Sequence, residues 1–276
     1  RSVYNLLKMK KIPDVFLRSM NILTDDIYGE FASLDIQHYI EKFIDSKCTF
    51  SVNFKNHYLD MDIKTREKIE DNLLKQIIKR CLILAYYHNE ENHNTSPILM
   101  ELLQTQNLKK LPIKGKLLGP REINSGSTSF GSVNKVCIWR DEECKKLIVH
   151  ELVHYHDIDC RSLGDNINRI VSENFNIAPE IEKRLYEAYT ESCANIFNCF
   201  ICAYECDNKS NIKLAKKMYL TELKYSIFQT AKILNFYGFK DIYDFVKKYD
   251  GRNLFQQSTS VFSYFFVKTA FLFNID

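Results

Sequence analysis

The sequence has no long apolar run. Its longest apolar stretch, residues 261–273, is too short to cross a bilayer and contains Lys268, so we interpret it as a core helix and expect no membrane span. Glycine and proline are scarce, with 8 and 5 residues among 276, while hydrophobic residues make up 45%. This composition excludes collagenous, low-complexity and disordered chains and is typical of a globular protein.

A strong charge of one sign is also missing. The 38 basic residues nearly balance the 35 acidic ones, for a formal net charge of +3. Proteins that bind DNA or RNA usually carry a basic surface, so we expect no nucleic-acid partner. Lysines do gather within residues 109–116, and a solvated connector explains them more simply than a phosphate-binding face.

The cysteine count does not suit a disulfide framework. Nine is an odd number, and a chain of this length buries enough surface to fold without disulfides. Reduced thiols favour an intracellular protein, either cytoplasmic or virion-associated. The chain begins at Arg1 with no signal-peptide-like segment, which suggests a fragment, a processed product or an ordered part of a protein.

A turn-rich polar segment at residues 124–132 divides the chain. Residues 1–120 are expected to be mainly helical, with a short strand at 48–54 and helices over 65–88 and 98–106. Residues 121–276 are expected to form a second region, which begins with a strand at 133–139. Its predicted helices cover residues 141–159, 179–204, 211–236, 241–249 and 260–273. The sequence thus predicts a predominantly helical α+β fold with a small sheet.

One sequence motif indicates a possible metal site. Within the predicted helix 141–159 the sequence reads His150-Glu151-Leu152-Val153-His154. Two imidazoles four residues apart share a helix face and can bind one metal ion, and Glu151 would lie beside the position of a zinc-bound water. The alternative is an amphipathic helix with two ordinary polar histidines. The preceding strand and a downstream carboxylate favour the zinc site.

That downstream carboxylate is Glu187, the predicted third zinc ligand, on the predicted helix 179–204. Glu191 lies on the same face one turn later, where it can hydrogen-bond the far nitrogen of a histidine ligand. Asp157, three residues after His154, is a rival third ligand or a second support of this kind. The simpler alternative for both glutamates is a solvated helix face.

Together these two elements resemble the glutamate-zincins, the thermolysin-like metallopeptidases, whose pattern is His-Glu-x-x-His followed by Asn-Glu-x-x-Ser-Asp. Here the second element reads Tyr186-Glu187-Ala188-Tyr189-Thr190-Glu191, with Tyr, Thr and Glu in place of Asn, Ser and Asp. The resemblance covers residues 150–197. It implies a two-lobed zincin-like fold, Zn²⁺ as the cofactor and a protein or peptide substrate that pairs with the edge strand 133–139.

The resemblance also implies amide hydrolysis. Glu151 would act as general base, taking a proton from the zinc-bound water and passing it to the leaving amine. The oxyanion formed from the substrate carbonyl needs a further hydrogen-bond donor. Four side chains have suitable chemistry, and the sequence does not choose among them: Tyr155, His156, Tyr189 and Tyr264.

A second likeness is to uncharacterised predicted metallopeptidases of giant DNA viruses. It is carried by residues 123–128, 138–143 and 259–264 and by the Asn- and Lys-rich composition. This likeness suggests a viral origin and adds nothing to the mechanism.

Other interpretations stay open at this point. The chain could be a non-catalytic virion or scaffold protein with a structural zinc site, although such a site more often closes its fourth position with a protein ligand. The N-terminal hundred residues could regulate the catalytic region. A cysteine hydrolase would need a local signature that the sequence lacks. We interpret four cysteines in one helical pattern as buried thiols rather than a second zinc site: Cys193, Cys199, Cys202 and Cys206.

Overall fold

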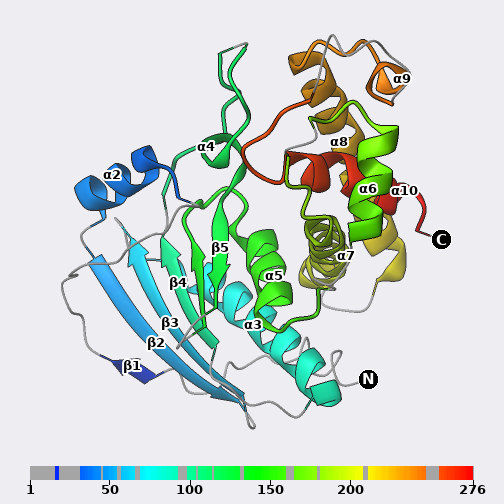
Figure 1. The fold of residues 1–276 in the computed structure, drawn as a ribbon. Helices are drawn as coiled ribbons and strands as arrows, with labels where there is room; N and C mark the ends of the chain where they lie inside the picture. The colour runs from blue at the N-terminus through cyan, green and yellow to red at the C-terminus, as the bar shows by residue number, and fades with distance from the viewer. Residues whose placement is uncertain are drawn as a thin grey trace.

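The computed structural model of the chain describes residues 16–18, 32–44, 46–54, 57–65, 69–92, 98–103, 105–113, 115–130, 134–159, 165–178, 181–207, 211–246 and 255–275. It has an α+β fold in which helices predominate, as the sequence predicts (Figure 1). A mixed sheet forms one side of the molecule, and a group of helices forms the other.

Within the described residues, the sheet has six strands in the order β1-β2-β3-β4-β6-β5. Their bounds are Phe16–Arg18 for β1, Ser46–Phe54 for β2, His57–Thr65 for β3, Ile98–Leu103 for β4, Gly126–Ser129 for β5 and Lys135–Ile138 for β6. Strands β1 to β3 are antiparallel neighbours, β4 runs parallel to both β3 and β6, and β5 is antiparallel to β6. Strand β5 is therefore an edge of the sheet.

Two predictions for the first 120 residues are wrong. Residues 98–103 form β4 instead of a helix, because this strand lies inside a parallel part of the sheet and is buried along nearly its whole length. The predicted helix 65–88 begins later than expected, as the helix α3, Asp71–Asn92, since Thr65 is the last residue of strand β3. The strand expected at 48–54 is present as part of β2. Four of the six strands found among the described residues thus come from a region that was expected to be mainly helical.

The predicted edge strand is also wrong. Of residues 133–139, residue 133 lies outside the described part of the chain and Lys135–Ile138 form β6, which is enclosed by β4 and β5. The edge is formed by Gly126–Ser129, within the segment that the sequence suggested to be only a turn. Its small polar residues pair in register with β6, from Gly126 opposite Ile138 to Ser129 opposite Lys135.

The helices of the second region follow the predicted order. The predicted helix 141–159 is α5, Cys144–Tyr155, and 179–204 is α7, Tyr186–Asp207, with residues 179 and 180 outside the described part of the chain. A further helix that the sequence did not predict, α6, spans Asp165–Asn174. The remaining helices are α2 (Leu34–Phe43), α4 (Pro120–Ile123), α8 (Ile212–Phe236), α9 (Ile242–Phe245), the π-helical η1 (Phe262–Val267) and α10 (Lys268–Phe273). Of the predicted helix 241–249, residues 247–249 lie outside the described residues.

The first hydrophobic core lies between the sheet and the helices α3, α5 and α7. Ile77, Cys81 and Leu84 of α3, whose spacing of three and four residues predicts one helix face, are fully buried in it. Strand β3 contributes alternate residues to it, namely Leu59, Met61 and Ile63. This core fixes α5 against the sheet on one side and against α7 on the other.

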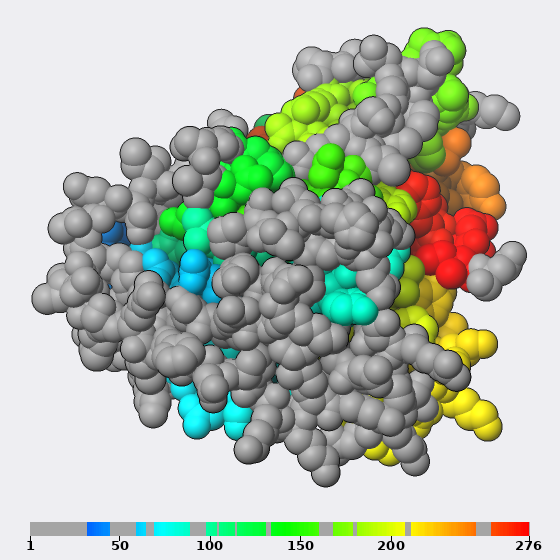
Figure 2. Space-filling view, turned by 90° about the horizontal axis from the view of Figure 1, so that it is seen from below, coloured from blue at the N-terminus to red at the C-terminus, as the bar shows by residue number. Residues whose placement is uncertain are grey.

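A second, aromatic core holds the other helices together. Phe245, Phe255 and Phe262 are almost fully buried in it, and the rings of Phe245 and Phe266 lie 4.7 Å apart between centroids. Helix α10 packs against α8, and Figure 2 shows the two side by side at one end of the molecule. Among the described residues, no helix combines the length and apolar character needed to cross a membrane.

Candidate metal centre

Helix α5 carries the His-Glu-x-x-His motif between the sheet and α7. Leu152 and Val153 are completely buried in the first core, so they fix the rotation of the helix about its axis. His150 and His154, four residues apart, then share the face that contacts α7. Both imidazoles are buried, with 3% and 7% of their surface exposed.

The structure brings His150, His154 and Glu187 together. The Nε2 atoms of the two histidines are 3.2 Å apart, and Glu187 Oε2 lies 3.4 Å from His150 Nε2 and 3.1 Å from His154 Nε2. Bonds of about 2.0–2.1 Å to a tetrahedral ion place ligand atoms about 3.3–3.4 Å apart. The distances among these three atoms are therefore close to those among three ligand atoms of a tetrahedral site. The three side chains could hold a metal ion.

The far nitrogen of each imidazole has a carboxylate partner. Glu191 Oε2 lies 2.8 Å from His150 Nδ1, and Asp159 Oδ2 lies 2.7 Å from His154 Nδ1. Such partners orient metal-binding histidines and direct the Nε2 lone pair toward the ion. The sequence pointed to Glu191 for this role and to Asp157 as a second candidate, but it did not single out Asp159.

Asp157 lies in a different position because α5 ends at Tyr155. Asp157 is exposed, and its φ of 52° turns the backbone out of the helical path. The spacing of three residues from His154 therefore does not place the two side chains on one face. Asp159, after this turn, is buried and faces His154.

The carboxylates make the centre favourable for a cation. Burial alone would lower the histidine pKa values, but hydrogen bonds with Glu187 and Glu191 raise the pKa of His150 to about 9. In the same way, Asp159 and Glu187 raise the pKa of His154 to about 10. Burial would raise the pKa of Glu187, yet the two histidines hold it far below its usual value. A positive charge between the two imidazoles is thus stabilised from three sides.

Glu151 occupies a separate, buried position next to the edge strand. The Thr128 hydroxyl of β5 lies 2.7 Å from Glu151 Oε2 and donates a hydrogen bond to it. Burial outweighs the attraction of His150 and His154 and raises the pKa of Glu151. Strand β5 comes so close because Gly126 has no side chain: a Cβ there would lie 3.0 Å from Glu151 Oε1.

Of the four candidate oxyanion donors, the structure places Tyr264 at the centre. Its ring centroid is 5.9 Å from that of His150, and its hydroxyl is close enough to Glu187 for this carboxylate to affect its pKa. Burial and the nearby negative charges raise its pKa well above the usual value, so the hydroxyl keeps its proton. Tyr264 belongs to η1, and π-helical turns frequently occur at functional sites.

The other three candidates lie elsewhere. Tyr155 hydrogen-bonds the backbone of Leu99 in β4, and His156 stacks on His88 of α3 with 4.6 Å between ring centroids. Tyr189 is exposed on α7.

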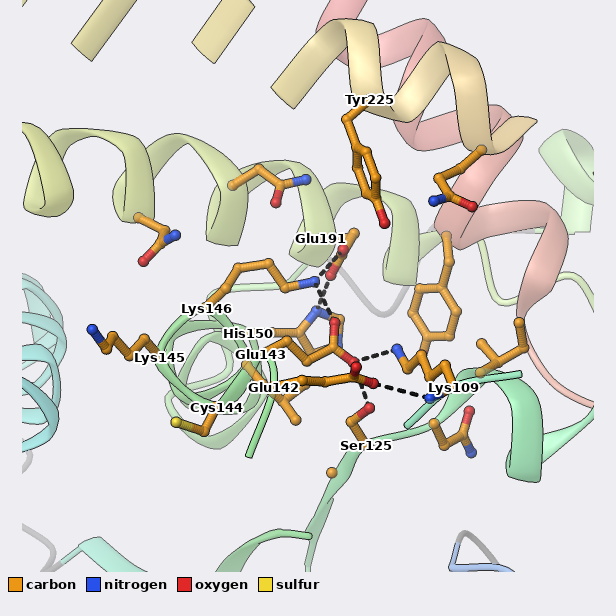
Figure 3. A pocket seen from close by; sticks show the side chains of 18 of the residues that line it. Lys109, Ser125, Glu142, Glu143, Cys144, Lys145, Lys146, His150, Glu191 and Tyr225 are labelled. Atoms are coloured by element: carbon orange, nitrogen blue, oxygen red, sulfur yellow. Dashed lines mark hydrogen bonds and ion pairs between the residues drawn. The ribbon is translucent and has the colours of Figure 1, made fainter. Parts of the chain in front are cut away.

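A cavity of about 1060 Å³ opens beside the centre, lined by residues of β5, α5, α7, α8 and the C-terminal helices. His150, Glu151 and Tyr264 are part of its wall. Figure 3 shows Ser125 and Lys109 on one side of this cavity and Tyr225 of α8 on the other. Lys109 belongs to the predicted basic connector, and its ammonium pairs with Glu143 at the start of α5. The connector therefore forms part of the rim of the cavity.

The cysteines of α7 do not form a comparable group. Among the described residues, the group of three or more potential ligands that converges is the one at His150. Burial raises the pKa of Cys199 to about 12 and also raises that of Cys202, so neither thiol ionises at neutral pH. This protonation disfavours a nucleophilic role.

Comparison with known proteins gives one viral relative and no family. The chain is 31% identical over 161 residues to uncharacterized protein R210 of Acanthamoeba polyphaga mimivirus, an alignment that covers 55% of this chain and 39% of that protein. The chain thus spans less than half the length of this relative. No protein-family model and no solved structure matches the chain. The match agrees with the predicted likeness to giant-virus proteins.

Proposed function

We propose that the protein is a zinc-dependent peptidase. The observation that carries this proposal is the convergence of His150, His154 and Glu187 at 3.1–3.4 Å, with Glu151 beside them on the cavity wall. Two imidazoles and a carboxylate form a ligand set that suits zinc and leaves its fourth position open. The resemblance to the glutamate-zincins is consistent with the same residues.

A zinc ion bound by these residues would polarise a substrate carbonyl and lower the pKa of a water molecule. Glu151 is positioned to take a proton from that water and to pass it to the leaving amine. Its raised pKa suits both steps, because a carboxyl group with a pKa nearer neutrality both accepts and donates a proton readily. Thr128 keeps the carboxylate directed toward the cavity.

Strand β5 and Tyr264 complete the proposed site. As the edge of the sheet, β5 offers backbone groups with which an extended peptide can pair, beside Glu151. Tyr264 offers a protonated hydroxyl on the side of His150 and Glu187, which suits a donor to the developing oxyanion. The proposed substrate is therefore an extended segment of a peptide or protein.

The alternative, a virion or scaffold protein with a structural zinc site, explains the ligands but not their surroundings. A structural site is usually closed by a fourth protein ligand, whereas His150 and Glu151 adjoin the cavity of about 1060 Å³. A buried carboxyl group held by Thr128 beside the ligands also has no use in such a site.

Metal analysis and peptide cleavage test the proposal together. We expect about one zinc per chain in the purified protein, and loss of that zinc in His150→Ala because one of three ligands is removed. Glu151→Gln should retain zinc and lose hydrolysis of a degenerate peptide library by at least about 100-fold. A chelator should abolish cleavage by the unmodified protein, and added zinc should restore it.

Two exposed residues provide matched controls. His38→Ala on α2 and Glu173→Gln on α6 make the same chemical changes away from the centre and should preserve both zinc and activity. Far less than one zinc per chain, unchanged by His150→Ala, would refute the metal site. Full zinc with no cleavage of any peptide would instead favour the structural alternative.

A further inference from the structure

Lys268 is a buried lysine in the wall of the cavity beside the metal centre. It is the first residue of α10, only 5% of its surface is exposed, and it lines the same cavity as His150 and Glu151. Tyr264 precedes it by four residues on the same helical segment, so the two side chains lie about one turn apart. Lys268 is therefore close to the proposed site of reaction without being part of the metal centre.

Two of the three carboxylates near Lys268, those of Glu191 and Glu143, are bound to other residues, while the third, Glu222 of α8, lines the same cavity and attracts the ammonium from beyond ion-pair distance. Glu191 pairs with Lys146 at 2.6 Å and with His150 at 2.8 Å, and Glu143 pairs with Lys109. In the part of the chain that the structure describes, no carboxylate oxygen lies within the 4.0 Å ion-pair distance of Lys268 Nζ. The Lys268 ammonium lies over the ring of Phe265, 5.9 Å from the ring centroid.

A buried ammonium without a counter-ion is unfavourable. Burial lowers the pKa of Lys268, and the more distant charges of Glu191, Glu222 and Glu143 offset this effect only in part. Natural proteins seldom retain such a group unless an anion compensates it. Because Lys268 faces a cavity large enough for several amino-acid residues, a ligand that enters the cavity can supply that anion.

We propose that Lys268 binds a carboxylate of the peptide substrate and thereby determines which residue is accepted near the cleaved bond. This inference rests on the proposed peptidase function and specifies its substrate. The carboxylate can belong to an acidic side chain or to the C-terminus of the peptide, since both present the same two oxygens. A neutral substrate would leave the ammonium uncompensated.

Three degenerate octapeptide pools, all N-acetylated, distinguish these sources. One contains Glu at a scanned position and a C-terminal amide, the second contains Gln and the amide, and the third contains Gln and a free C-terminus. We expect the protein to cleave either the first or the third pool about thirtyfold better than the second. Lys268→Met should abolish this preference, whereas Lys268→Arg should retain it.

Lys232→Met is the matched control, because Lys232 lines the same cavity but is exposed. It should keep the preference. Equal cleavage of the three pools by the unmodified protein, or equal loss of preference in both Met variants, would overturn the role of Lys268. Thermal unfolding of Lys268→Met, followed by circular dichroism, verifies that this variant is folded.

A binding measurement separates this role from the proposed function. Zinc-loaded Glu151→Gln protein, immobilised and exposed to the pools, should retain the carboxylate peptides about thirtyfold better than the neutral ones, and the added Lys268→Met change should remove the difference. Selective retention without cleavage by the unmodified protein would refute the peptidase and support the carboxylate site. Cleavage by the unmodified protein without selective retention would support the peptidase and refute the carboxylate site.

Discussion

The Thr128 hydroxyl links the edge strand to the carboxyl group of Glu151 over 2.7 Å. Thr128→Val preserves the shape of the side chain and removes this hydrogen bond. Because a hydrogen bond to a charged group contributes about 1.5–3 kcal/mol, we expect kcat for peptide cleavage to fall at least about tenfold. Zinc content and KM should change little, since neither the metal ligands nor the cavity wall is altered.

The neighbouring Ser129 provides the control for this prediction. Its hydroxyl donates to the backbone carbonyl of Lys135 at 3.3 Å and is exposed, so Ser129→Ala should leave kcat unchanged. Thr128→Ser, which keeps the hydroxyl, should restore most of the activity. An unchanged kcat in Thr128→Val would show that the hydrogen bond does not orient Glu151.

The residues of the centre differ in how far the sequence predicts them. His150 and His154 follow from a helix-face argument that holds because both lie within α5. Glu187 and Glu191 likewise share one helix, α7. Asp159 was not singled out because it follows the end of α5 and a residue with φ of 52°, where helical spacing no longer applies. Tyr264 could not be chosen from four candidates because its proximity to Glu187 depends on how the C-terminal helices pack.

At the scale of elements, the start of α5 is anchored by Glu143. Its carboxylate binds Ser125 and Lys109, and it lies 3.8 Å from Lys146. Burial alone would raise its pKa, but the two lysines lower it from 4.5 to about 2. A lowered pKa in the folded state stabilises the protein above pH 4.5, and this stabilisation is lost as the pH falls from 4.5 toward 2.

Glu143→Gln should therefore lower the free energy of unfolding by about 1–3 kcal/mol at pH 7 and by less at pH 3.5. Urea unfolding at the two pH values measures this difference. Glu142→Gln removes the same charge from the adjacent exposed position and should have a much smaller effect at both. A loss for Glu143→Gln that is equal at pH 7 and pH 3.5 would contradict the role of the ionised carboxylate.

Strand β4 explains why the sheet was harder to predict than the helices. Ile98–Leu103 is rich in Leu and Met, which favour helices, and it follows a Ser-Pro pair that suggests a helix start. Its strand conformation is imposed by β3 and β6, which pair with it on both sides. Helices α3, α5 and α8 were predicted more easily because each repeats its own pattern over many residues.

Across the whole molecule, Arg80 connects α3, beneath the sheet, to α7, which carries Glu187. Its guanidinium is fully buried and binds both carboxylate oxygens of Glu205, at 2.7 and 3.2 Å. Glu205→Ala would leave this charge without its carboxylate, and we expect the free energy of unfolding to fall by about 3–5 kcal/mol. Chemical denaturation at neutral pH measures the change.

Two further variants test whether the charge pair is responsible. Replacing both partners, Arg80→Met with Glu205→Leu, should restore most of the stability, because no buried charge is left uncompensated. Glu173→Ala, which breaks the exposed pair of Glu173 with Arg169 on α6, should cost less than about 0.5 kcal/mol. A similar cost for Glu205→Ala and Glu173→Ala would rule out the proposed link.

The position of β4 between β3 and β6 also sets the order of events during synthesis. A ribosome releases the N-terminal strands first, so β3 and β4 can pair while the other edge of β4 stays open until Lys135–Ile138 emerge. His150 and His154 follow, and Glu187 emerges later still. The group of His150, His154 and Glu187 can therefore assemble only after the nascent chain has supplied all the described strands of the sheet. A newly made chain in which these three side chains have come together is one whose described strands have all left the ribosome.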